Sequence, residues 1–132
     1  MKIKGLAHIG LFVKDIKRSE SFYYKYLGFE KIWNNINKTP DGDALVVFIK
    51  NGSCIIELVQ LPDFNKRQDG YFDHIAIAVE DIDAVIKLLK KQDIDFEEGS
   101  YTIAPQVFKE GSKWIMFRGP DGEHLELNEL ML

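Results

Sequence analysis

Apolar and polar side chains alternate along two short stretches of the chain, residues 5–13 and 72–79. This period of two is typical of strands with one buried face. The apolar face holds Ala7, Ile9, Leu11 and Val13 in the first stretch, and Ile75, Ile77 and Val79 in the second. His8 and His74 lie on the opposite face, mostly beside small residues, as in the wall of a cavity.

Each predicted strand leads into a helical pattern. Asp15 and Asp81 come just before the two helices, where an aspartate can cap the first turn. The first helix is expected to end at Gly28, because glycine favours the left-handed position after a helix. The second carries an amphipathic stripe with spacings of three and four: Ile82, Val85, Leu88 and Leu89. Turns between later strands are predicted at Asp41-Gly42, Asn51-Gly52 and Asp121-Gly122.

The chain contains the same unit twice. Residues 8–16, HIGLFVKDI, match residues 74–82, HIAIAVEDI, at five of nine positions. Each copy continues through a helix to a closing strand that carries a glutamate, CIIELV at 54–59 and EHLELN at 123–128. Such internal similarity indicates tandem modules. We therefore expect an α+β fold in which each half is a strand, a helix and two or three further strands.

One domain over residues 1–132 is expected, because a chain of this length suits a single core. Module one covers about residues 1–60 and module two about residues 72–132. The polar segment between them, about residues 61–71, is punctuated by proline and glycine and predicts a linker.

Two histidines and two glutamates occupy matching places in the two modules: His8 and Glu57, then His74 and Glu126. A carboxylate in an apolar strand is costly to bury without compensation, and a metal ion supplies it. A single strand histidine is more often a satisfied polar residue, and a single strand glutamate usually faces solvent. The symmetric placement of all four favours one divalent metal: Zn²⁺, Ni²⁺, Co²⁺, Fe²⁺ or Mn²⁺.

Composition narrows the class of protein. The chain is 45% hydrophobic and 29% charged, which fits a folded globular protein rather than a disordered one. No apolar run is long enough for a membrane span or a signal peptide, and the single Cys54 suits a reducing compartment, so we expect a cytoplasmic protein. A net charge of −4 argues against nucleic acid as a partner.

Three motifs resemble the glyoxalase, or vicinal oxygen chelate, superfamily, and most closely bacterial glyoxalase I (lactoylglutathione lyase). They are HIGLFVKDIKRSESFYYKYLGFE, YFDHIAIAVEDI and PDGEHLELNE. The resemblance covers nearly the whole chain and implies paired βαβββ modules that form a partly closed mixed sheet around a metal. For short bacterial members it also implies a homodimer with its sites at the interface. Whether the ligands of one site come from one chain or two stays open.

The resemblance implies metal ligands at His8, Glu57, His74 and Glu126. It implies a lyase or isomerase with one divalent metal per site, Ni²⁺, Zn²⁺ or Co²⁺. The substrate is a small 2-oxo compound or hemithioacetal, hence a thiol adduct, and it reacts by proton transfer through a metal-stabilised enediolate. Either Glu57 or Glu126 is the general base.

Two positions depart from bacterial glyoxalase I, which places an arginine and an asparagine there to hold glutathione. This chain has Phe12 and Leu61, and an apolar side chain cannot replace a clamp on a carboxylate. Phe12 is itself a candidate substrate contact. The other candidates, on strands near the closing motif, are Trp114, Met116 and Arg118.

Two alternatives share this fold. The first is an acyl-CoA epimerase like methylmalonyl-CoA epimerase, which uses similar metal chemistry but has a longer linker between its modules. The second is a non-catalytic protein that binds a small molecule, like the bleomycin resistance proteins, which lack the metal residues. Fosfomycin thiol transferases use three protein ligands, so a fourth at Glu57 speaks against that activity.

Overall fold

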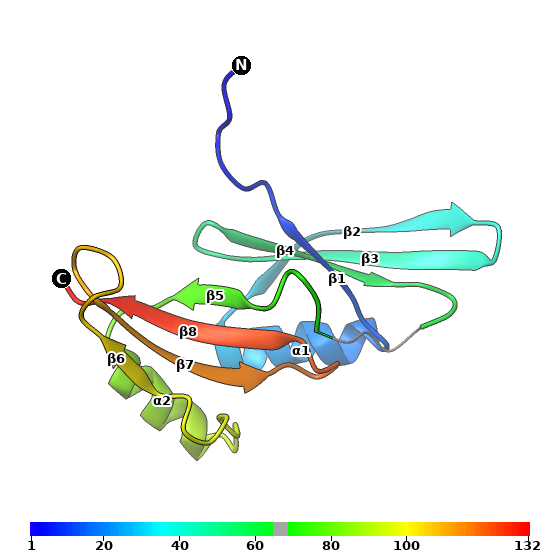
Figure 1. The fold of residues 1–132 in the computed structure, drawn as a ribbon. Helices are drawn as coiled ribbons and strands as arrows, with labels where there is room; N and C mark the ends of the chain where they lie inside the picture. The colour runs from blue at the N-terminus through cyan, green and yellow to red at the C-terminus, as the bar shows by residue number, and fades with distance from the viewer. Residues whose placement is uncertain (65–68) are drawn as a thin grey trace. The chain divides into compact units, whose positions relative to one another are not determined.

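Each half of the chain folds as a strand, a helix and three further strands (Figure 1). The computed structural model describes residues 1–64 and 69–132, and its contacts divide the chain into two units, Met1–Arg67 and Gln68–Leu132. The first unit contains β1 (Ile9–Phe12), α1 (Ile16–Leu27), β2 (Glu30–Thr39), β3 (Gly42–Asn51) and β4 (Cys54–Gln60). The second contains β5 (Ile75–Ala78), α2 (Ile82–Lys91), β6 (Thr102–Ala104), β7 (Ser112–Arg118) and β8 (His124–Leu130).

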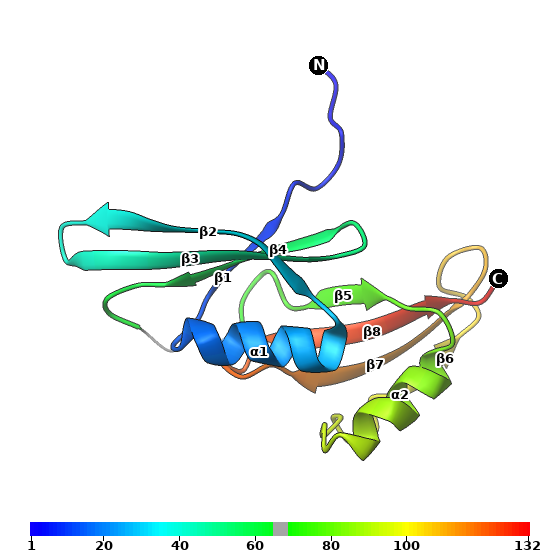
Figure 2. The same ribbon diagram turned by 180° about the vertical axis from the view of Figure 1, so that it is seen from behind.

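The two units share one strand order. The first sheet runs β1-β4-β3-β2 and the second runs β5-β8-β7-β6 (Figures 1 and 2). In each, the opening strand is parallel to the closing strand, while the remaining neighbours are antiparallel. The predicted α+β class and the repeated βαβββ unit are confirmed.

The closing strand of each sheet has one strongly buried face. Ile56 and Leu58 of β4 are fully buried, as are Leu125 and Leu127 of β8. Helix α1 packs on β3 and β4, and α2 packs on β8. Because neighbours in a strand point to opposite sides, the residues between these pairs, Glu57 and Glu126, lie on the other face.

Helix ends follow the sequence prediction. The Asp15 carboxylate accepts hydrogen bonds from the backbone N–H groups of Lys17 and Arg18, and Asp81 caps α2 through the N–H of Ala84. Gly28 closes α1 with φ 69°, the left-handed conformation that glycine adopts without strain.

The stripe predicted for α2 is wrong at one position. Leu88 is 56% exposed, whereas Ile82, Ile86 and Leu89 are buried. Ile86 is four residues after Ile82 and three before Leu89, so those three residues share the buried face of α2.

The opening strands are shorter than predicted. β1 and β5 each keep four residues, so His8 and His74 lie one residue before their strands. The alternation itself is confirmed: Ile9 and Leu11 are partly covered, and Gly10 and Phe12 are exposed. The predicted turn residues lie at the junctions of strands: Asp121-Gly122 falls between β7 and β8, while Gly42 begins β3 and Asn51 ends it. Residues 65–68 of the predicted linker are outside the described residues.

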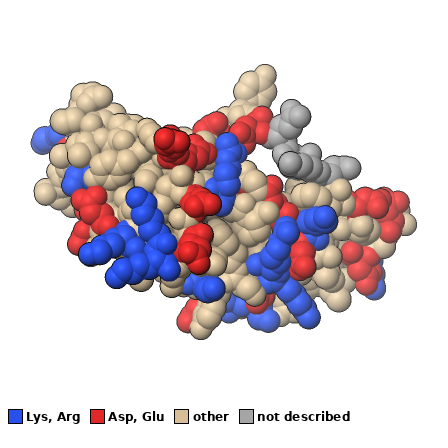
Figure 3. Space-filling view, turned by 90° about the horizontal axis from the view of Figure 1, so that it is seen from below, with Lys and Arg blue, Asp and Glu red and all other residues tan. Residues whose placement is uncertain are grey.

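Surface charge is mixed in sign. On the face drawn in Figure 3, acidic and basic side chains lie side by side. Among the helices described, α1 and α2, neither is long and apolar enough to cross a membrane.

Candidate metal centre

In the first unit the predicted ligands His8 and Glu57 lie together. The Nε2 atom of His8 is 3.6 Å from Oε1 of Glu57. Parallel pairing of β1 with β4 sets Gly10 beside Glu57, so no side chain stands between the carboxylate and the strand that follows His8. The His8 ring also meets the ring of Phe48 edge-on, with centroids 5.4 Å apart. We call His8 and Glu57 half-site one.

The second unit repeats this geometry. The Nε2 atom of His74 is again 3.6 Å from Oε1 of its glutamate, Glu126. Ala76 of β5 stands beside Glu126 as Gly10 stands beside Glu57. The Glu126 side chain is 9% exposed, against 26% for Glu57. We call His74 and Glu126 half-site two.

The donor types and spacing in each half-site fit a divalent cation. Two ligand atoms about 2.0–2.1 Å from one metal lie about 3–3.4 Å apart, close to the observed spacing. At 3.6 Å the two atoms are too far apart for a hydrogen bond to hold them together. Within the described residues, no three potential ligands gather around one point. Each unit therefore brings two donors, half of the predicted set.

Three polar residues that sequence reasoning did not single out as functional support half-site two. The Asn128 side-chain amide donates to Oε2 of Glu126 at 2.9 Å. The Ser112 hydroxyl, on the neighbouring β7, lies 3.2 Å from Oδ1 of Asn128. Asp73 accepts a hydrogen bond from Nδ1 of His74 at 2.9 Å, and this bond lowers the pKa of Asp73. Strand alternation reveals that Asn128 and Glu126 share a face; the contacts of Asp73 and Ser112 need the fold.

His124 lies on the same face of β8 as Glu126. Its ring is 6.2 Å from that of His74, centroid to centroid. Nε2 of His124 lies 2.9 Å from Oε1 of Glu97, and Nδ1 lies 3.5 Å from Oδ2 of Asp73. Both ring nitrogens are buried, and neither contact has the geometry of a hydrogen bond.

Arg118, a predicted substrate contact, is engaged within its own unit. Its guanidinium donates to both carboxylate oxygens of Asp69, at 2.7 and 3.0 Å, and also to Glu97 and to the carbonyl of Gly122. The bond to Asp69 raises the pKa of Arg118 and lowers that of Asp69. A substrate anion would have to compete with these carboxylates for Arg118.

The other predicted substrate contacts lie on the faces that carry the half-sites. Met116 and Trp114 of β7 pair with Glu126 and Asn128 across the sheet. Met116 is buried, whereas Trp114 is partly covered. Phe12 of β1 lies on the face of Gly10 and is 42% exposed. Their contact with a substrate stays a prediction.

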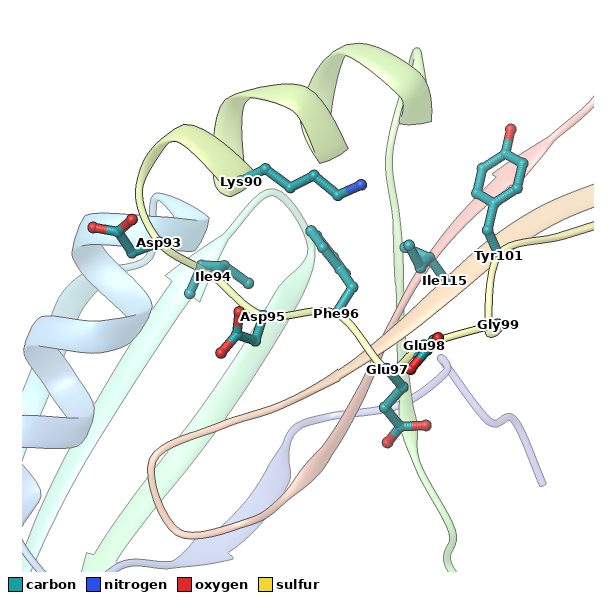
Figure 4. Close-up of a pocket in the computed structure, with 10 residues that line it drawn as sticks. All are labelled: Lys90, Asp93, Ile94, Asp95, Phe96, Glu97, Glu98, Gly99, Tyr101 and Ile115. Atoms are coloured by element: carbon teal, nitrogen blue, oxygen red, sulfur yellow. The ribbon is translucent and has the colours of Figure 1, made fainter.

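A surface hollow of about 700 Å³ lies elsewhere in the second unit, beside the carboxyl end of α2 (Figure 4). It is lined by Lys90, Asp93, Ile94, Asp95, Phe96, Glu97, Glu98, Gly99, Tyr101 and Ile115. In Figure 4 the Glu97 carboxylate points away from Lys90 and Phe96. The hollow includes none of the four predicted ligands.

Known proteins are similar to this chain in sequence and in fold. A glyoxalase family protein from Enterococcus faecalis is 30% identical, with a TM-score of 0.74 over 98% of this chain and 100% of its own. The fosfomycin resistance protein FosX from Listeria monocytogenes, solved with Mn(II), is 23% identical, with a TM-score of 0.70 over 96% of this chain and 92% of its own, and thus shares the fold. Mouse mitochondrial methylmalonyl-CoA epimerase is 29% identical over 101 residues, 70% of this chain and 56% of its own length.

The family profile described as "Glyoxalase/Bleomycin resistance protein/Dioxygenase superfamily" matches residues 5–127, nearly the whole chain. The match includes both modules and all four predicted ligands. The chain belongs to this superfamily.

Proposed function

We propose that His8, Glu57, His74 and Glu126 together hold one divalent cation, and that the protein is a lyase or isomerase of the glyoxalase I type. The observation that carries the proposal is the repeated spacing of 3.6 Å between an imidazole Nε2 and a carboxylate Oε1 in the two half-sites. Two imidazoles and two carboxylates suit Ni²⁺, Zn²⁺ or Co²⁺.

The reaction is a proton transfer between neighbouring carbons of a small oxygenated substrate. When bound, the cation supplies Lewis acidity to the substrate oxygens, which contributes several kcal/mol of transition-state stabilisation. A carboxylate oxygen of Glu57 or Glu126 takes the proton from the carbon that bears the hydroxyl. The same oxygen returns it to the adjacent carbonyl carbon, and the proton of the original hydroxyl group passes to the former carbonyl oxygen, so that a hemithioacetal becomes a 2-hydroxy thioester. Such general base catalysis contributes about 10²–10⁴-fold.

The thiol part of the substrate need not be glutathione. Phe12 presents a partly exposed aromatic ring on the face of half-site one, and Leu61 is partly covered. Neither side chain can bind a carboxylate by hydrogen bonds. These two residues favour a thiol other than glutathione, because a glutathione carboxylate would find no hydrogen-bond donor in either side chain.

A direct test is to load the purified protein with Ni²⁺, Zn²⁺ or Co²⁺ and to assay it with methylglyoxal and several thiols, glutathione and bacillithiol among them. We expect one bound cation for each set of the four predicted ligands: His8, Glu57, His74 and Glu126. We also expect turnover that a chelator abolishes. Glu57→Gln and Glu126→Gln are each expected to reduce turnover, one as the base and one as a ligand.

Turnover that survives the chelator or both substitutions would contradict the proposal. If glutathione is used as well as the other thiols, Phe12 and Leu61 do not determine the choice of thiol. Cation binding without turnover on any substrate would point to a binding protein that has kept its metal residues.

Epimerisation of an acyl-CoA is a second candidate, favoured by the 29% identity to the mouse epimerase. It uses the same transfer of a proton next to a carbonyl. Incubation with methylmalonyl-CoA in deuterated water distinguishes the two. An epimerase incorporates deuterium at the carbon next to the thioester, and a glyoxalase leaves that substrate unlabelled.

We also propose that the protein is a homodimer. Several large apolar side chains of β2 are exposed on the single chain: Ile32, Trp33 and Ile36, each more than half exposed. Exposed apolar groups of this size often mark an interface with another protein. A second copy of the chain is the occupant that the resemblance to short bacterial members of the superfamily implies.

A further inference from the structure

Half-site two is braced by side chains that half-site one lacks. Its carboxylate, Glu126, has one oxygen, Oε2, held by the Asn128 amide at 2.9 Å, while Oε1 faces the His74 ring. Glu126 is 7% exposed, and a buried carboxylate bound at one oxygen has little freedom to rotate. Its remaining oxygen is thus kept in the direction of the histidine.

Ser112 supports the orientation of the Asn128 amide. The fully buried Ser112 hydroxyl is 3.2 Å from Oδ1 of Asn128, and a hydroxyl can donate to that oxygen. With Oδ1 accepting from Ser112, the amide nitrogen is the atom that faces Glu126. An amide flipped by 180° would set oxygen against oxygen. The hydrogen-bond chain thus fixes the side-chain orientations of both residues.

Asp73 performs the same task for the histidine. Its Oδ2 atom accepts a hydrogen bond from the Nδ1–H group of His74, at 2.9 Å. A neutral imidazole has one proton, so Nε2 keeps the lone pair that a ligand needs. Carboxylates that hold the second nitrogen of a ligating histidine both orient the ring and raise its basicity.

The matching positions of half-site one are all apolar. Ala7 stands before His8 where Asp73 stands before His74, and Val59 is two residues after Glu57 as Asn128 is after Glu126. Val46 pairs with Val59 as Trp114 pairs with Asn128, so Ala44 takes the place of Ser112. Among the described residues, the Glu57 carboxylate has one polar contact, His8 at 3.6 Å.

From this asymmetry we infer that the two glutamates have different roles. Asn128, Ser112 and Asp73 are positioning residues that hold Glu126 and His74 as the permanent half of the metal centre. Glu57 is the carboxylate that can turn toward the substrate and move its proton. This inference rests on the proposed function and decides which of the two glutamates is the base.

The first experiment compares Glu57→Gln with Glu126→Gln. Affinity for Co²⁺ is measured by competition with a chromophoric chelator, and proton transfer is measured by deuterium uptake from solvent. We expect Glu57→Gln to weaken Co²⁺ binding clearly less than Glu126→Gln does, while deuterium uptake falls by about 10²-fold or more. Glu126→Gln is expected to lose most of its Co²⁺ affinity.

The second experiment exchanges the supporting residues between the two half-sites. Asn128→Val installs the residue that half-site one has, and it is expected to weaken Co²⁺ binding by about 10–100-fold. The reverse transplant, Val59→Asn with Ala44→Ser, is expected to hold Glu57 in place. Co²⁺ affinity then rises or stays the same while deuterium uptake falls. A purely structural role predicts instead that Co²⁺ affinity and deuterium uptake fall together.

The role of Asp73 is tested separately, through the tautomer of the His74 ring. In metal-free protein, ¹⁵N NMR of the His74 ring reports which nitrogen carries the proton. We expect the Nδ1–H form in the wild type, a mixture in Asp73→Ala, and the Nδ1–H form again in Asp73→Asn, whose amide oxygen can still accept. Since the Asp73 side chain is 60% exposed, none of these variants should disturb folding, which circular dichroism checks.

The outcomes separate this inference from the proposed function. If the wild type binds Co²⁺ tightly but Glu57→Gln and Glu126→Gln weaken it equally, the division of roles is overturned and the metal centre stands. The division of roles is also overturned if Glu126→Gln keeps its Co²⁺ and loses deuterium uptake. If the wild type binds no divalent cation, the proposed function fails and this inference fails with it.

Discussion

At the scale of single residues, Arg118 illustrates how an apparent substrate contact can have an internal role. Its two bonds to Asp69 join the start of the second unit to β7. The bond to Arg118 lowers the pKa of Asp69 in the folded protein, so the unfolded chain takes up a proton at higher pH. The stabilisation is therefore complete above the unfolded pKa and is lost as the pH falls through the folded one.

We predict that Asp69→Asn flattens the acid side of the stability profile. Urea unfolding at pH 7, 5 and 3 measures the effect. The wild type should lose more stability than the variant between pH 5 and pH 3, and added salt should reduce the difference, because the pair is exposed. Parallel profiles for the two proteins would show that the pair contributes nothing measurable.

Cys54 gives a second prediction at this scale. It lies at the start of β4, and burial raises the pKa of its thiol. Because the thiolate is the reactive form, we expect iodoacetamide to label Cys54 at pH 8 more slowly in the folded protein than in urea. Mass spectrometry follows the labelling, with Cys54→Ser as the unlabelled control. Equal rates in both conditions would contradict this prediction.

At the scale of elements, the caps and turns could be predicted because their chemistry is local. Asp15, Gly28 and Asp81 lie where the sequence predicts them, since an N-cap or a left-handed residue depends on its own few neighbours. The face of each closing strand could likewise be predicted from alternation. The exposure of Leu88 could not be predicted from the sequence. Two faces of a helix with similar apolar content differ only in what packs against them.

The residues that support half-site two, Asp73, Ser112 and Asn128, show that part of the site also could not be predicted from the sequence alone. Asp73 and His74 are adjacent, and alternation along a regular strand would send their side chains to opposite faces. They meet because β5 begins at the following residue. Ser112 reaches Asn128 through the pairing of β7 with β8, which no spacing along the chain reveals.

The cap of α1 offers a test at the element scale. Asp15→Ala removes the acceptor for two backbone N–H groups and should lower the free energy of unfolding by about 0.5–2 kcal/mol. Asp15→Asn keeps an acceptor at the same place and should behave almost as the wild type does. Chemical denaturation measures the free energy of unfolding of the wild type and of the two variants. A loss of equal size in both variants would mean that charge, not the cap, matters.

At the scale of the whole molecule, cation binding and folding are linked. A cation that binds only the folded state at about 100 times its Kd adds about 2.7 kcal/mol to the free energy of unfolding. We therefore predict a Tm several degrees higher with saturating Co²⁺ than with chelator. His74→Ala should remove most of that difference. A Tm that does not respond to Co²⁺ would argue against a metal centre.

Mixing variants tests how the half-sites are shared within the proposed homodimer. His8→Ala and His74→Ala each destroy every site when present alone. If one site draws its two halves from two chains, a mixed dimer has one intact site, and mixing should recover part of the lost turnover. If both halves come from one chain, mixing recovers nothing. Light scattering supplies the mass of each species.

The sidedness of the two sheets has a practical consequence. Because the apolar residues next to Glu57 and Glu126 are directed to the helix-covered face, the side chains that would meet a small molecule can vary without disturbing the packing. Phe12, Phe48 and Trp114 all retain some exposure. A combinatorial library confined to these three codons should yield mostly well-folded proteins, which makes this scaffold a convenient starting point for directed evolution of new substrate preferences.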